Sequence, residues 1–144
     1  MSSVTGPLAG RRILLVEDEY LIAETMEEWL GRAGADVIGP VPSVEQALAL
    51  IEMEAGALDG AVLDVNLGRG KTAYPIADRL IELGVPYLFA TGDVRIIDDA
   101  AHRERPRLEK PISQAQLLGA VQALLEKRLR SSPSVCRAGP ASPG

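Results

Sequence analysis

The segment Ile13-Leu14-Leu15-Val16-Glu17-Asp18 joins four consecutive apolar residues to two acidic ones. A short apolar run without alternation is typical of a strand that is buried on both faces of a sheet. The same arrangement, an apolar run that leads to a polar residue, recurs in three later segments: Ala61-Val62-Leu63 before Asp64, Leu88-Phe89-Ala90 before Thr91, and Arg107-Leu108-Glu109 before Lys110. These segments are predicted to be strands whose ends carry polar side chains.

Between these strands the apolar residues recur at the spacing of amphipathic helices. Such helices are predicted from Leu21 to Leu30, behind Ser43, from Ile76 to Ile81, and from Leu117 to Leu129. Residues 93 to 105 have a weaker pattern that could form one more short helix. Val37, Ile38 and Val41 predict a second strand, with Pro40 and Pro42 ending it. The alternation predicts an α/β fold in which helices cover both faces of a five-stranded parallel sheet.

The composition narrows the class of protein. The chain has 144 residues, of which 47% are hydrophobic, and this suits one globular domain. Its formal charge of -5 argues against general binding to nucleic acid or to an anionic membrane. No segment has the roughly 20 apolar residues of a membrane helix, and no signal peptide is visible. The single cysteine, Cys136, fits a reduced cytoplasmic location.

The polar strand ends predict a metal site. The carboxyl ends of parallel strands meet at one edge of the sheet, so Glu17, Asp18 and Asp64 are expected to lie together there. Their mutual repulsion would be relieved by Mg²⁺, which prefers oxygen ligands and keeps several waters. Asp18 and Asp64 are the expected direct ligands, Glu17 is expected to act through water, and a backbone carbonyl just after Asp64 would complete the protein's share.

The same residues predict phosphoryl transfer. Asp64 would be the nucleophile toward phosphorus, while the Lys110 ammonium and the Thr91 hydroxyl would neutralise the phosphoryl oxygens. Each residue alone has an ordinary structural explanation, since acidic residues favour helix starts and a lone lysine is usually solvated. Four residue types suited to one reaction, at four strand ends, favour a functional site.

These motifs give the chain, from about Arg11 to Arg130, a resemblance to the response-regulator receiver domains of two-component signalling. The matching segments are Leu15-Val16-Glu17-Asp18-Glu19, Val62-Leu63-Asp64-Val65-Asn66-Leu67, Phe89-Ala90-Thr91-Gly92 and Glu109-Lys110-Pro111. The resemblance implies a doubly wound, flavodoxin-like fold with strand order 2-1-3-4-5. It also implies that Asp64 accepts phosphate from a histidine kinase or phosphotransfer protein, that Asn66 supplies the metal-binding carbonyl, and that the Lys110–Pro111 bond is cis.

Two positions depart from the usual receiver pattern. The first acidic residue is Glu17, where Asp is commoner, and it is still expected to serve through water. The second position is the one three residues before the lysine. Most receivers have Tyr or Phe at this position, and the rotation of this aromatic ring signals phosphorylation. In this chain the position is occupied by Arg107. Together with Phe89-Ala90-Thr91-Gly92, this resembles the FATGUY subgroup, which occurs largely in alphaproteobacteria, often as stand-alone proteins in stress signalling. The resemblance thus implies a phosphorelay protein that signals through a changed protein-binding surface, with only self-phosphorylation and autodephosphorylation as activity.

The expected organisation is a flexible lead-in at 1–10, a receiver domain at 11–130 and a disordered tail at 131–144. Two other functions remain open. A metal-dependent phosphohydrolase with an aspartyl-phosphate would usually need a second Asp two residues after the nucleophile, where this chain has Asn66. A phosphate-independent, receiver-like binding module would not need the full set of Asp18, Asp64, Thr91 and Lys110.

Overall fold

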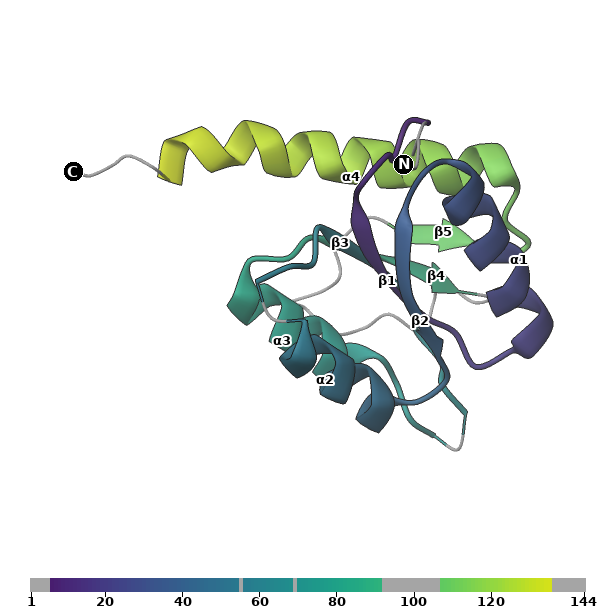
Figure 1. Cartoon of the computed structure of the whole chain (residues 1–144). Helices are drawn as coiled ribbons and strands as arrows, with labels where there is room; N and C mark the ends of the chain where they lie inside the picture. The colour runs from purple at the N-terminus through teal and green to yellow at the C-terminus, as the bar shows by residue number, and fades with distance from the viewer. Residues whose placement is uncertain (1–5, 55, 69, 92–106, 136–144) are drawn as a thin grey trace.

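Five parallel strands form one sheet in the order β2-β1-β3-β4-β5 (Figure 1). The computed structural model describes residues 6–54, 56–68, 70–91 and 107–135. Its strands are β1 Arg12–Val16, β2 Asp36–Val41, β3 Gly60–Asp64, β4 Tyr87–Thr91 and β5 Arg107–Glu109. Its helices are α1 Tyr20–Arg32, α2 Val44–Met53, α3 Tyr74–Leu83 and α4 Gln114–Val135. The predicted parallel sheet and its strand order are confirmed, and the short helix considered for 93–105 lies outside the described residues.

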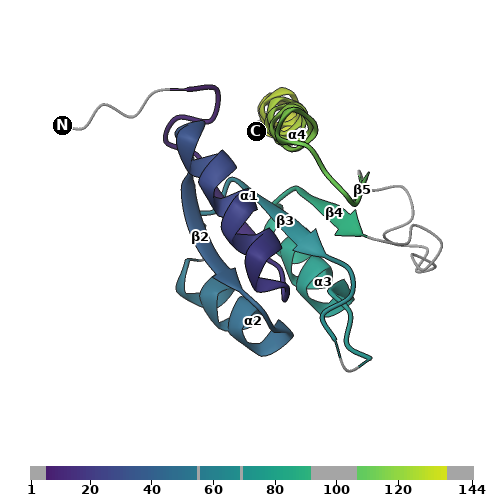
Figure 2. The same cartoon turned by 90° about the vertical axis from the view of Figure 1, so that its right-hand side faces the viewer.

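Helices cover both faces of this sheet (Figure 2). Neighbouring residues of each strand point to opposite faces, so each strand contributes to two apolar clusters. On one face, Leu14, Leu63 and Phe89 pack with buried residues of α2 and α3. On the other face, Leu15 and Val62 pack with buried residues of α1 and α4. Strands buried on both faces explain why their sequences are apolar without alternation.

Two helix starts have the capping-box pattern that the sequence carries. Ser113 N donates to Gln116 Oε1 at 2.8 Å, and Gln116 N donates to Ser113 Oγ at 3.1 Å. At the start of α2, Gln46 N donates to Ser43 Oγ at 3.2 Å. These bonds satisfy backbone N–H groups that have no partner within the helix, so they stabilise the starts of α2 and α4.

The second strand contains Val37, Ile38 and Val41, as predicted, and ends before Pro42, but Pro40 lies inside β2 instead of ending it. The strand is at the edge of the sheet, and its register against β1 shifts between Leu14 and Val16. A proline is tolerated at such an irregularity on an edge strand because no ladder hydrogen bond needs its missing N–H. Gly39, with φ +106°, passes so close to Leu15 that a Cβ would stand 2.8 Å from the Leu15 carbonyl oxygen.

Residues on either side of the 11–130 range also belong to the described structure. Leu8 is fully buried in the apolar cluster that contains residues of α1 and α4, and its N–H donates to the Ala33 carbonyl at 2.8 Å. Residues 6–10 therefore pack on the domain. At the other end, α4 continues past Arg130 to Val135 and projects beyond the sheet (Figure 1).

Among the described residues, none of the helices combines the length and the hydrophobicity that a bilayer crossing requires. The longest of them, α4, carries several charged residues along its 22 positions.

The burial of Leu8 predicts a large loss of stability on truncation. Leu8→Ala should lower the free energy of unfolding by about 2–5 kcal/mol, because it leaves a cavity in this apolar cluster. Leu21→Ala is the matched control, since Leu21 is 73% exposed and its truncation should cost less than about 0.5 kcal/mol. Urea unfolding of the three proteins measures this, and equal stability of both variants would contradict the packing of Leu8.

Candidate functional site

The sheet brings the polar strand ends to one edge, because four adjacent strands finish there. Asp64 and Thr91 are the last residues of β3 and β4. Glu17 follows β1 directly, and Lys110 follows β5. The register pairs Asp64 with Ala90 and Thr91 with Glu109, so these ends are level across the sheet.

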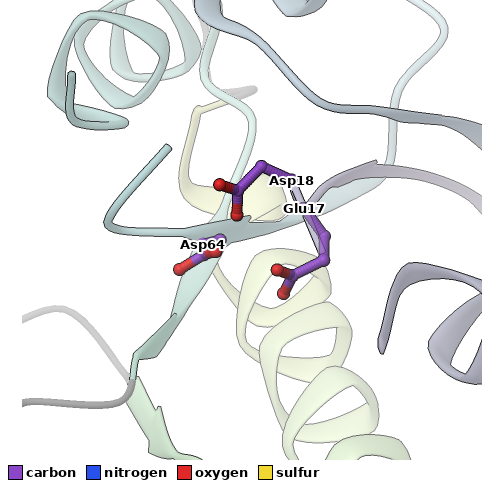
Figure 3. Close-up of side chains that lie close together, drawn as sticks. All are labelled: Glu17, Asp18 and Asp64. Atoms are coloured by element: carbon purple, nitrogen blue, oxygen red, sulfur yellow. The ribbon is translucent and has the colours of Figure 1, made fainter. Parts of the chain in front are cut away.

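Three carboxylates gather at this edge (Figure 3). One oxygen from each of Glu17, Asp18 and Asp64 lies within 4.8 Å of the others. Glu17 is 3% exposed and Asp64 is 5% exposed, whereas Asp18 is exposed. The buried pair is thus removed from water, while Asp18 forms the open side of the cluster.

Lys110 supplies the positive charge. Its Nζ lies 2.9 Å from Glu17 Oε1 and 3.4 Å from Asp64 Oδ2. Its backbone N–H donates to the Thr91 carbonyl at 2.8 Å, which ties the end of β5 to the end of β4. The ammonium therefore stands between the two buried carboxylates, next to the strand that carries the hydroxyl.

The backbone holds both buried carboxylates. Glu19 N donates to Glu17 Oε2 at 3.2 Å, and Asn66 N donates to Asp64 Oδ1 at 3.3 Å. The exposed Asn66 begins the loop after β3, which folds back through a pairing of Asn66 with Thr72. A Cβ on Gly68 would lie 3.4 Å from Asp18 Oδ2, so this loop passes beside the acidic cluster.

Burial and the adjacent Glu17 carboxylate raise the pKa of Asp64 from 3.8 to about 8, against the opposing effect of Lys110. Burial opposes the charge on Lys110, but the carboxylates of Glu17 and Asp64 outweigh it and raise the pKa of the ammonium. One ammonium therefore does not fully neutralise the cluster. Three carboxylates with an open side are the hard oxygen donors that Mg²⁺ prefers, so the residues present fit this ion.

The site also contains a feature that the sequence prediction missed. Leu21, the first residue of the apolar pattern that predicted α1, is 73% exposed. With Ile22 and the half-buried Trp29 it lines a groove of about 250 Å³, which Lys110, Pro111 and Ile112 also line. Helical spacing shows which residues share a face, but it cannot show where the neighbouring element ends and leaves that face open.

Two further features near the site concern a peptide bond and a loop lysine. The Lys110–Pro111 peptide bond is cis, as the resemblance implied. Lys71, in the loop after β3, pairs with Glu45 of α2 at 3.4 Å, and both side chains are exposed. The latter observation agrees with a solvated loop lysine.

No protein-family model matches this sequence, and none of the curated proteins matches it either. Among solved structures, the signal receiver domain of a modulated diguanylate cyclase from Desulfovibrio desulfuricans has a TM-score of 0.74 and 25% identity, covering 85% of this chain and 98% of that one. A response regulator receiver protein from Sinorhizobium medicae has a TM-score of 0.70 and 27% identity, covering 84% and 98%. SdrG from Sphingomonas melonis is 39% identical, with a TM-score of 0.67 and coverage of 87% and 99%.

The sheet order, the acidic strand ends and these neighbours agree on one class of protein. The chain belongs to the response-regulator receiver domains.

The raised pKa of Asp64 predicts how the stability of the metal-free protein depends on pH. Between pH 3.8 and about 8 the folded protein holds a proton on Asp64 that the unfolded chain releases, so stability falls as pH rises through this window. Asp64→Asn cannot titrate there. The variant should therefore lose less stability as the pH rises. At pH 8 its free energy of unfolding without metal should exceed that of the wild type by about 0.5–2 kcal/mol, a usual gain when charge repulsion in a functional site is removed.

Urea unfolding in EDTA between pH 5 and pH 8 measures both effects. Asp78→Asn is the control, because Asp78 is an exposed residue of α3. An Asp64→Asn protein with the wild-type pH dependence would contradict the raised pKa.

Proposed function

We propose that this chain is a response regulator that accepts a phosphoryl group on Asp64 from a histidine kinase or a phosphotransfer protein. The observation that carries the proposal is the position of Lys110 Nζ, 2.9 Å from Glu17 and 3.4 Å from Asp64, at an edge where three carboxylates meet. An ammonium beside a buried, backbone-held carboxylate is suited to neutralise a phosphoryl group that arrives on that carboxylate.

In the proposed reaction a carboxylate oxygen of Asp64 forms a bond to phosphorus, while the bond between phosphorus and the donor's imidazole nitrogen breaks. The leaving imidazole takes up a proton from solvent. Lys110 donates to one phosphoryl oxygen, and the Thr91 hydroxyl donates to another. When bound, Mg²⁺ would supply further neutralisation of the phosphoryl charge and would be held by Asp18, Asp64, the Asn66 carbonyl and, through water, Glu17.

The proposed protein signals by a change of its binding surface and not by turnover of a substrate. Slow hydrolysis of the aspartyl-phosphate would reset the protein. The residue two positions after Asp64 is Asn66, which cannot act as the general acid of a phosphohydrolase. Arg107 and the Phe89-Ala90-Thr91-Gly92 segment support assignment to the FATGUY-type subgroup. Arg107 pairs in register with Phe89, so the usual aromatic switch position is filled by a cation next to a buried ring.

The first test is phosphorylation itself. Incubation with acetyl phosphate and Mg²⁺, or with a cognate kinase, should add one acid-stable and base-labile phosphoryl group per chain, detected by intact-protein mass spectrometry. Asp64→Asn should lose this labelling, while Asp78→Asn in α3 should keep it. Undiminished labelling of Asp64→Asn would refute the assignment. A wild type that takes up no phosphoryl group would favour the phosphate-independent binding module.

The second test is metal binding. At a hundredfold excess over its dissociation constant, Mg²⁺ should stabilise the folded protein by about 2.7 kcal/mol. Asp18→Ala should abolish this gain, and it should raise the stability of the metal-free protein because it relieves repulsion in the cluster. Thermal unfolding with and without Mg²⁺ measures both effects. A wild-type melting temperature that does not respond to Mg²⁺ would show that the metal site is wrong.

A further inference from the structure

We infer that Glu17 is a positioning residue for Lys110: its carboxylate holds the ammonium beside Asp64 before any metal or phosphoryl group is present. The inference rests on the proposed function, and it gives Glu17 a task that does not pass through the metal. The task expected for Glu17 from the sequence is only that of a water-mediated metal ligand.

The distances make Glu17 the closer partner of Lys110. Lys110 Nζ is 2.9 Å from Glu17 Oε1 but 3.4 Å from Asp64 Oδ2. The side chain of Glu17 is 1% exposed and that of Lys110 is 17% exposed, so water screens their attraction little. The contact is therefore of the strong, charge-assisted kind, unlike the exposed pair of Lys71 and Glu45.

Hydrogen bonds to the backbone hold Glu17 in place. Its Oε2 accepts from Glu19 N at 3.2 Å, and its own N–H donates to the Val41 carbonyl at 3.1 Å. One carboxylate oxygen thus bonds the backbone and the other bonds the ammonium. A residue held in this way can define the position of a flexible lysine side chain, which would otherwise have many rotamers.

Lys110 can keep this contact while it serves the reaction. An ammonium has three donor protons, so one can remain on Glu17 while another turns from Asp64 to a phosphoryl oxygen on Asp64. Loss of the contact would leave a buried carboxylate without its cation, which is strongly unfavourable. Glu17 therefore favours the arrangement in which Lys110 stays over Asp64 during transfer.

Two substitutions of Glu17 separate the effect of side-chain length from the effect of charge. Aspartate keeps the charge of Glu17 but is shorter by one methylene group, so it should no longer reach Nζ. Glutamine keeps the length but lacks the charge. If Glu17 acts only on the metal, neither change should alter Lys110 in the metal-free protein.

The direct test is NMR of the lysine side-chain ammonium groups in EDTA. The chain has three lysines, Lys71, Lys110 and Lys127, so the signals can be assigned by single substitution. In the wild type, the Lys110 Nζ protons should exchange slowly with water and give a visible signal. This signal should be lost in Glu17→Gln and in Glu17→Asp, and it should persist in Asp18→Asn. An unchanged Lys110 signal in the two Glu17 variants would overturn the inference.

Phosphorylation kinetics provide a second readout. At Mg²⁺ concentrations that saturate each protein, Glu17→Gln and Glu17→Asp should react with acetyl phosphate about 10-fold to 100-fold more slowly than the wild type, as expected for a misplaced reacting group. Full recovery of the wild-type rate at saturating Mg²⁺ would overturn the inference in favour of a purely metal-linked role. A wild type that is not phosphorylated would refute the proposed function, whereas the NMR result would still decide whether Glu17 holds Lys110.

Discussion

The burial of two carboxylates beside one ammonium is the constraint around which this molecule is arranged. Glu17 and Asp64 are almost fully removed from water, and Lys110 lies within ion-pair distance of both. Buried charges of like sign are costly unless they are paired and hydrogen-bonded. The backbone N–H groups of Glu19 and Asn66 supply such bonds, yet the raised pKa of Asp64 indicates that the cost is not fully offset.

The rest of the fold makes this unfavourable edge tolerable. Two apolar layers, one on each face of the sheet, hold the strands whose ends carry the charges. The strands keep their register through backbone ladders, so the charged ends cannot move apart without breaking the sheet. Functional sites commonly hold such destabilising groups, and the surrounding core supplies the stability that permits them.

The ends of β4 and β5 are joined beside the site. The Thr91 carbonyl accepts from the N–H of Lys110, so the ends of these two strands are linked. Phe89, two residues before Thr91, contacts Tyr74 and Tyr87 edge to face, with ring centroids 6.0 Å and 5.4 Å apart. Aromatic packing thus lies on β4 and at the start of α3, while Arg107 occupies the position that is aromatic in most receivers.

The sequence by itself determined the class of fold and which polar residues lie at the strand ends. Runs such as Ile13–Val16 and Ala61–Leu63 are too short and too apolar for anything but buried strands, and parallel strands place Asp64, Thr91 and Lys110 at one edge whatever the details of packing. Only the tertiary structure decided which partners these residues have. The pairing of Lys110 with Glu17, the burial of Leu8 and the exposure of Leu21 depend on contacts between segments far apart in the chain, and local periodicity carries no information about such contacts.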